Sequence, residues 1–298
     1  MKKTILAIMA LLAAFCTWAA DFESLRKGKS MVVPEGTTIE GIITSDYRQP
    51  NSELNRNTGW NNVDLSLSHK TVYIESIDGK FGFRLIFPIM YDNRFEAGTL
   101  VRIDISGCQL TAEKGPERYT ISGISAKTVT VLEKNVPIPE KKRRVAEICP
   151  EDIYTKVTLE GLEFLSKQGS FANIYERCAI GTPLNENTID SHLNAADGWA
   201  QLLEDSDGSA IYMQVNFSCS WRRNNIGVPK GVGDVCGIIV TGDNRRYGIS
   251  FGPYSIRPIT FQDIRIPYEE SSSFTTVVSW RWDRNYYEGM SLRDAGFV

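Results

Sequence analysis

Side chains that could carry out acid–base, nucleophilic or metal chemistry are sparse in this chain. It has only 2 histidines, His69 and His192, and both lie in polar, turn-rich stretches. A Ser–His–acid or Cys–His centre needs a histidine, and the sequence contains no GxSxG, HExxH or P-loop motif. The 36 acidic residues show no spacing that nominates a carboxylate pair for glycoside hydrolysis. We therefore expect a protein that is not an enzyme and that uses no cofactor or metal.

Two features instead indicate a binding protein. Asn-containing stretches at 48–69 and 169–198 carry Trp60 and Tyr175, whose rings suit stacking on sugars. Further on, polar and apolar residues alternate over 211–217, which predicts a strand with a polar outer face, and a Trp–Arg–Arg cluster follows it. Solvated loops and an ordinary solvent-facing strand are the simpler alternatives. The candidate ligand-binding residues are Trp60, Tyr175, Tyr212, Gln214, Asn216, Trp221, Arg222 and Arg223.

The N-terminus has the pattern of a secretory signal peptide. Two lysines precede an apolar run over 5–15, which is too short to span a bilayer, and small residues for cleavage follow it. We expect a signal peptide over residues 1–20, cleaved after Ala19 or Ala20. The protein would then be exported to the periplasm, the cell surface or the medium.

A lipid anchor at Cys16 is an alternative that we disfavour, because Phe15 is a poor fit to the small residue required before a lipidated cysteine. No other segment is apolar for long enough to span a membrane. Loss of the two leader lysines takes the net charge from −3 to −5, which disfavours nucleic acid as the partner. The overall composition, 42% hydrophobic and 23% charged, is that of a globular protein and excludes collagen-like and low-complexity chains.

The cysteines indicate neither a metal site nor a clear disulfide framework. No CxxC pair is present, and the spacing fits no zinc pattern. An oxidising compartment would permit one or two disulfides, but small buried apolar side chains are the commoner use of such cysteines. We expect buried thiols at Cys108, Cys149, Cys178, Cys219 and Cys236.

The chain contains two copies of one unit. Four short segments recur in the same order, and their common order makes the repeat persuasive although each match is weak. The matched pairs are 38–43 with 157–162, 73–79 with 202–208, 95–101 with 229–235, and 118–123 with 246–251.

Each copy reads as about five strands. The runs are rich in β-branched and aromatic residues, and Asp78-Gly79 and Asp207-Gly208 are hairpin turn signals. An EF-hand loop at 205–208 is excluded, because the later acidic positions are missing. A short helical turn is expected before each fourth strand. The expected strands lie near 38–47, 71–77, 82–88, 99–112 and 118–133, and near 155–165, 199–204, 209–217, 234–241 and 246–265.

This layout predicts an all-β protein of two tandem OB-like, five-stranded Greek-key barrels. The first barrel is expected over 21–135 and the second over 153–268. A Pro-containing linker with the basic run 141–144 lies between them at 136–152. Residues 269–298 read as a linker and an orphan strand, which could be the start of a missing domain.

The first copy resembles a secreted domain-of-unknown-function family of the Bacteroidetes. The resemblance is carried by Thr38–Asp46, Val72–Glu75, Gly98–Val101 and Tyr119–Gly123. It covers about 38–135, with a divergent second copy at about 153–266. It implies an OB-like barrel exported to the envelope and assigns no catalytic residues.

Together these patterns favour an exported, non-catalytic binding protein of the cell envelope, whose partner is an oligosaccharide or an envelope protein. One alternative is a single-stranded nucleic-acid-binding accessory module of an extracellular nuclease, in which the Trp–Arg–Arg cluster stacks on bases. The other alternative is a structural spacer.

Overall fold

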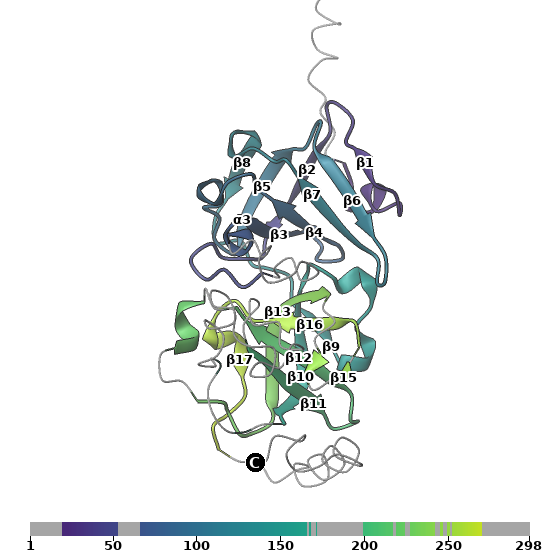
Figure 1. Cartoon of the computed structure of the whole chain (residues 1–298). Coiled ribbons are helices and arrows are strands. Elements are labelled where there is room, and N and C mark those ends of the chain that lie inside the picture. Colours follow the sequence, from purple (N-terminus) through teal and green to yellow (C-terminus); the bar gives the residue numbers. More distant parts are fainter. Residues whose placement is uncertain are drawn as a thin grey trace, which may run out of the picture. The chain divides into compact units, whose positions relative to one another are not determined.

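The computed structural model describes residues 20–52, 66–165, 167, 171, 199–216, 219–223, 227–241, 245–246, 249–250 and 252–269. These residues form mainly β-strands with a few short helical turns, so the all-β prediction is confirmed (Figure 1). They make two compact units: one holds the described residues up to 140 together with 149–156, and the other holds 141–148 and the described residues from 157 onward. None of the described helices is long and apolar enough to cross a membrane.

The first unit is built on one large, mostly antiparallel sheet. Its strands follow the order β1-β6-β7-β4-β3-β2-β5-β8, and only the contact between β4 and β7 is parallel. The elements are α2 (Phe22–Leu25), β1 (Met31–Val32), β2 (Thr38–Ile43), α3 (Leu67–Lys70), β3 (Thr71–Glu75), β4 (Gly82–Ile86), η2 (Met90–Asp92), β5 (Thr99–Asp104), β6 (Gln109–Glu113), β7 (Arg118–Ser122), η3 (Ala126–Thr128), β8 (Val129–Glu133) and η5 (Pro150–Asp152).

The second unit contains a closed five-stranded barrel. Its sheet runs β17-β13-β16-β12-β11-β10-β9, and an additional pairing of β13 with β10 closes the ring. As in the first unit, one pair of barrel strands, β12 and β16, is parallel. The elements are β9 (Lys141–Arg143), η4 (Val145–Glu147), β10 (Lys156–Phe164), β11 (Trp199–Asp205), β12 (Ala210–Val215), η7 (Ser220–Arg223), β13 (Gly233–Thr241), β14 (Arg245–Arg246), β15 (Ile249–Ser250), β16 (Tyr254–Arg257), η8 (Phe261–Asp263) and β17 (Ile264–Arg265).

The first three expected strands of each unit form near where the sequence places them, and the fourth of the second unit forms as β13. The fourth and fifth of the first unit are interrupted, and so is the fifth of the second unit, which is divided among the short strands β14 to β17. In the first unit the fourth becomes β5 and β6, because the Asp104 carboxylate accepts hydrogen bonds from the backbone and hydroxyl of Ser106, and Gly107 adopts a φ of +71°. The fifth becomes β7 and β8 on either side of Gly123. Among the described residues, no pairing closes the eight-stranded sheet of the first unit into a ring. Two matching barrels are therefore not confirmed.

The two Asp-Gly hairpins form as predicted and use related turns. Gly79, with a φ of +71°, donates its backbone N–H to the Ser76 carbonyl at 2.7 Å, and the Asp78 carboxylate accepts from the Ser76 hydroxyl. The hydrogen bonds from the Ser76 hydroxyl and from the Lys80 ammonium lower the pKa of Asp78 to about 2. In the second unit Gly208 donates to the Asp205 carbonyl at 3.0 Å, and the Asp205 carboxylate accepts two backbone N–H groups of the same turn.

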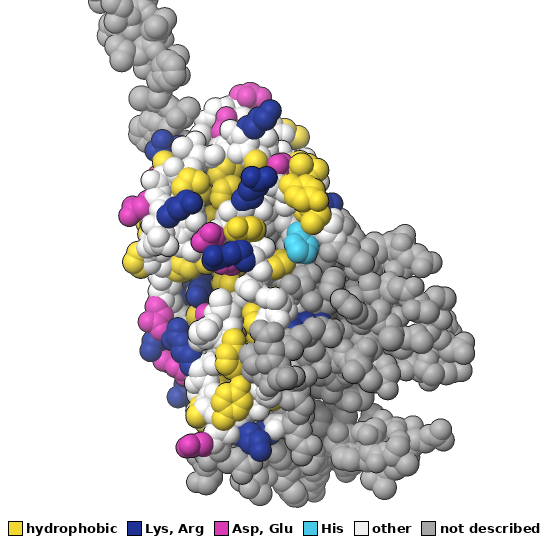
Figure 2. Space-filling model, turned by 90° about the vertical axis from the view of Figure 1, so that its left-hand side faces the viewer, with side chains coloured by type: hydrophobic (Ala, Val, Ile, Leu, Met, Phe, Trp, Pro, Cys, Tyr) yellow, Lys and Arg dark blue, Asp and Glu magenta, His cyan; other side chains and the backbone are white. Residues whose placement is uncertain are grey.

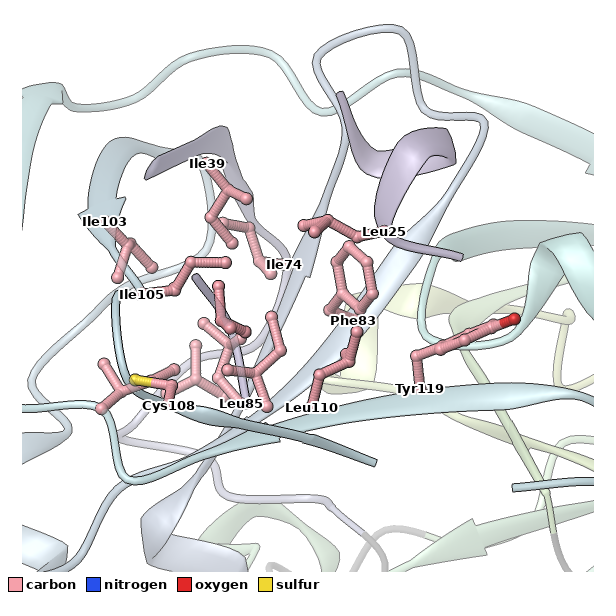
Figure 3. Close-up of a cluster of buried hydrophobic side chains, with 14 of the residues drawn as sticks. Leu25, Ile39, Ile74, Phe83, Leu85, Ile103, Ile105, Cys108, Leu110 and Tyr119 are labelled. Carbon is pink, nitrogen blue, oxygen red and sulfur yellow. The ribbon is translucent and has the colours of Figure 1, made fainter. Parts of the chain in front are cut away.

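A continuous apolar core fills the first unit (Figure 3). Phe83 lies at its centre and packs on Tyr119, whose hydroxyl points away from the aliphatic side chains. That hydroxyl donates to Glu117 and accepts from the backbone N–H of Gly28 at 2.7 Å. The Arg26 guanidinium lies 4.8 Å from the centroid of the Tyr119 ring. The core thus extends to the segment that precedes β1.

The stretch expected to be a linker contains secondary structure. The basic residues Lys141–Arg143 form β9, which pairs in parallel with β10 at the edge of the second sheet. Lys142 also forms an ion pair with Glu160 of β10 at 3.1 Å. A lysine-rich edge strand discourages pairing with other chains. The expected orphan strand in the C-terminal tail lies outside the described residues.

Four of the five expected thiols can be placed. Cys108, Cys219 and Cys236 are buried and Cys149 is half-buried, and no disulfide joins any two of these four. Burial raises the pKa of the Cys219 thiol to about 12, against the opposing effect of two nearby guanidiniums. The expectation of buried thiols is confirmed for Cys108, Cys219 and Cys236, whereas Cys149 is only half-buried and Cys178 lies outside the described residues.

Candidate functional site

The polar stripe expected on the third strand of the second unit is not a solvent-facing surface. Tyr212 and Gln214 lie on one side of β12, with Met213 and Val215 on the other, as the alternation predicts, and Asn216 directly follows the strand. However, the three polar residues are at most 3% exposed. The prediction that this stripe faces solvent is wrong.

The physical reason is a buried hydrogen-bonding cluster that the stripe helps to form. Arg257 of β16 donates from Nη2 to the Gln214 side-chain oxygen at 2.7 Å, and both side chains are buried. Arg222, predicted to bind ligand at the surface, is also fully buried, and its Nη1 donates to the Val215 carbonyl at 3.4 Å. Buried guanidiniums need acceptors, and the amide of Gln214 supplies one.

Trp221 is likewise part of the interior rather than an exposed stacking platform. Its indole N–H donates to the Ile259 carbonyl at 3.1 Å. Its ring packs against Phe171 and Phe261, with centroids 5.8 and 6.0 Å away. Because the ring is only 7% exposed, the surface role predicted for it is wrong in the folded barrel.

The remaining predicted residues cannot be placed at atomic detail. Trp60 and Tyr175 lie outside the described residues, and so does most of each Asn-containing stretch that contains them. Arg223 is the last residue of η7, and its side chain is not among those that the structure describes. Their binding roles stay predictions.

Two loops of the first unit lie side by side. One follows β2 and the other joins β4 to β5. The backbone N–H of Tyr47 in the first loop donates to the Phe95 carbonyl in the second at 3.0 Å. The buried Asn93 amide donates to the carbonyls of His69 and Thr71, at 2.9 and 3.3 Å, and so ties the second loop to the end of α3. These contacts hold both loops on one end of the sheet.

Large apolar and aromatic side chains are exposed on these loops. Tyr91 in η2 is 71% exposed, its neighbours Ile89 and Met90 are 53% and 38% exposed, and Tyr47 is 38% exposed. We call these four residues the Tyr91 patch. Figure 2 shows hydrophobic side chains gathered among charged ones on the face of the protein that it presents. Exposed aromatic residues clustered on loops are more informative than scattered exposed leucines.

The charges around the patch are largely paired with one another. Arg48 binds Asp46 through two hydrogen bonds of 3.0 and 2.7 Å and lies 3.3 Å from Glu96. The carboxylate of Asp46 raises the pKa of Arg48, which stays cationic. Arg94 donates from Nε to the Tyr91 carbonyl at 3.1 Å and thereby fixes the turn that carries the ring. The site is therefore an aromatic surface with a nearly balanced polar border.

His69 adds the one titratable group near neutral pH in this region. Burial lowers its pKa, which favours the neutral ring. Among the described residues, no group of three His, Cys, Asp or Glu side chains is placed to hold a metal ion. The Tyr91 patch and its polar border are suited to binding a partner through apolar contacts and hydrogen bonds.

Sequence reasoning missed this patch, although a signal for it exists. The apolar run 89–91 follows the expected third strand, 82–88, and leads into the segment expected to be a short helical turn. Apolar residues outside strands can enter the core, as Phe87 does, so the run indicates only a candidate patch, and its exposure has to be established from the structure.

Comparisons with known proteins leave these features to be interpreted from the structure. A scan against protein-family models found no match, and a search of curated proteins found no relative.

Proposed function

We propose that this chain is an exported, non-catalytic binding protein of the cell envelope that binds a glycan through the Tyr91 patch of its first unit. The observation that carries the proposal is the exposure of Tyr91 and of Tyr47 on two loops that a backbone hydrogen bond from Tyr47 to Phe95 joins. An envelope protein is the alternative partner for the same surface. The proposed export rests on the leader pattern in residues 1–20.

In this proposal both units are OB-like barrels. In the first, β5 and β6 together act as the fourth strand: β5 pairs with β2, and β6 pairs with β7. The parallel contact of β4 with β7 corresponds to that of β12 with β16 in the closed barrel. In OB-like barrels the loop after the first strand, which carries Tyr47 here, is a frequent binding site for oligosaccharides, and the resemblance to the secreted Bacteroidetes family agrees with this assignment.

Neutral sugars fit the chemistry of the patch. An exposed tyrosine ring offers a flat apolar face to the C–H groups of a pyranose and a hydroxyl for hydrogen bonding. Because Arg48 is already paired with Asp46 and Glu96, the border offers polar contacts without a strong net field. Nucleic acid is the less favoured ligand, because Trp221 and Arg222, which were expected to stack on bases, are buried in the second unit.

A binding assay with matched tyrosine variants tests the proposal. The purified protein is screened against a panel of neutral and acidic polysaccharides, and binding of the best ligand is measured at two salt concentrations. We expect Tyr91→Ala to weaken binding by about 3–10-fold, the worth of one aromatic stacking contact. Tyr268→Ala is the control, because Tyr268 is an exposed tyrosine, at 51%, that lies in the second unit.

Three outcomes would contradict the glycan proposal. They are the absence of binding to every polysaccharide, equal losses in the two tyrosine variants, and a steep fall of affinity with salt. The last outcome is typical of phosphate contacts and would favour the nucleic-acid alternative.

A further inference from the structure

Arg94 differs from the other arginine on the two loops that carry the Tyr91 patch. Arg48 binds the carboxylates of Asp46 and Glu96. Arg94 is exposed instead and forms no ion pair with any residue that the structure describes; its side chain donates from Nε to the Tyr91 carbonyl oxygen at 3.1 Å. The guanidinium has further N–H donors on both Nη atoms, and these remain for a ligand.

The guanidinium of Arg94 is held at the turn from which the exposed Tyr91 side chain projects. Two backbone hydrogen bonds of 3.3 Å close this turn over 89–93. Because a carbonyl oxygen lies about 2.4 Å from the Cα of its own residue, Nε of Arg94 lies within about 5.5 Å of the Tyr91 Cα. One short segment therefore presents both an aromatic ring, 71% exposed at Tyr91, and a planar set of hydrogen-bond donors.

The charges on the two loops favour a neutral ligand over an acidic one. Their described parts, 44–52 and 87–98, hold the carboxylates of Asp46, Asp92 and Glu96 against two guanidiniums, an excess of one negative charge. An acidic sugar would be repelled by this excess, whereas hydroxyl groups accept hydrogen bonds without carrying charge. Two hydroxyls on adjacent ring carbons, when gauche to each other, place two acceptors on one edge of a sugar. They suit the parallel N–H groups of a guanidinium, which binds paired oxygens through two hydrogen bonds.

We propose that Arg94 sets the specificity of the Tyr91 patch by binding two adjacent hydroxyl groups of a neutral sugar whose ring stacks on Tyr91. This inference rests on the proposed function and names its ligand class: neutral glycans whose residues keep two free hydroxyls on adjacent carbons. The 1,4- and 1,6-linked glucans keep such a pair on every residue. Within a linear 1,3-glucan the linkage occupies the oxygen between the two free ring hydroxyls, so the pair is missing.

Substitutions of Arg94 test the contact in the full chain. Affinities for soluble β-1,3-, β-1,4- and β-1,6-glucans, and for the neutral polysaccharide that binds best in the panel, are measured by isothermal titration calorimetry. We expect Arg94→Met to weaken binding of the best ligand by about 10-fold, because hydrogen bonds from a charged donor are lost. Arg94→Lys should restore only part of the affinity, since an ammonium group lacks the planar fork. Arg102→Met is the matched control and should bind as the parent does, because Arg102 is also exposed but lies on β5 and pairs with Glu40.

The linkage comparison separates contact with the ligand from support of the turn. The β-1,4- and β-1,6-glucans should bind at least about 5-fold more tightly than the β-1,3-glucan, and Arg94→Met should remove this preference. If Arg94 only fixed the turn that carries Tyr91, its loss would weaken binding of all glucans equally, and that result would overturn the inference.

The two tyrosine and arginine variants also distinguish this inference from the proposed function. Loss of binding in Tyr91→Ala with parental affinity in Arg94→Met would overturn the role of Arg94 and leave the glycan site intact. Equal binding of the three glucans by the parent, or a preference for acidic polysaccharides, would overturn the ligand class. No binding to any polysaccharide would contradict both the inference and the proposed function.

Discussion

Replacing Gln214 by leucine tests the buried cluster of the second unit. If Gln214 were part of a solvent-facing stripe, the change would alter the free energy of unfolding by less than about 0.5 kcal/mol. In the structure its side-chain oxygen accepts a 2.7 Å hydrogen bond from the guanidinium of Arg257, and both side chains are buried. Leucine has a similar volume but cannot accept that bond.

The size of the effect follows from the charge on the donor. A hydrogen bond to a charged group contributes about 1.5–3 kcal/mol, and a buried donor left without it loses its compensation for desolvation. We therefore expect Gln214→Leu to lower the free energy of unfolding by about 1.5–3 kcal/mol. With a urea m-value of about 2 kcal/mol/M, the unfolding midpoint would fall by roughly 1 M.

The measurement is urea unfolding followed by tryptophan fluorescence, to which the buried Trp221 contributes. A double-mutant cycle isolates the contact: Gln214→Leu, Arg257→Met and the double variant are compared with the parent. We expect a coupling energy of at least about 1 kcal/mol between the two positions. Additive effects, or a Gln214→Leu midpoint equal to that of the parent, would refute the proposed role of this bond.

Two further predictions concern the first unit. Gly82→Ala should destabilise it by about 1–3 kcal/mol, since a Cβ at this position would lie 2.3 Å from the Tyr154 carbonyl oxygen. An unchanged midpoint of urea unfolding, followed by circular dichroism, would contradict this packing. The free energy of unfolding should also fall as pH drops below about 6.5, because burial lowers the pKa of His69 and the unfolded chain takes up the proton more readily. His69→Gln should reduce this dependence, and an identical pH profile in the variant would count against it.

Much of the strand layout could be predicted because it is written in local patterns. Period-two alternation and the two Asp-Gly turns place the first three strands of each unit, and the turns form with the positive φ that glycine allows. The break between β5 and β6 could not be predicted in this way. It depends on Asp104 capping the backbone of Ser106, a side-chain interaction that leaves no periodic trace. Closure of a sheet also depends on pairings between distant strands, such as β10 with β13.

The expected solvent exposure of the polar residues along β12 was wrong for a related reason. Alternation along β12 fixes which side of the sheet each residue faces, and Gln214 and Met213 do face opposite sides. It does not fix whether that side meets solvent. β12 is paired on both edges, with β11 and β16, so its polar residues meet side chains of neighbouring strands such as Arg257. In a central strand, polar alternation is therefore as consistent with an internal hydrogen-bond network as with a ligand surface.

Exposed apolar residues outside strands are the more useful signal in a chain of this kind. A buried polar residue can be explained by a partner in the interior, as Arg257 explains Gln214. The run that includes Ile89, Met90 and Tyr91 has no such explanation, because these side chains are exposed. The loop itself is held in place by hydrogen bonds of Asn93 and Phe95. Leaving apolar area exposed on a fixed loop weakens the hydrophobic stabilisation of the fold. A contact outside the chain would recover that stabilisation, and this is the physical reason for testing Tyr91 before any residue of the polar stripe.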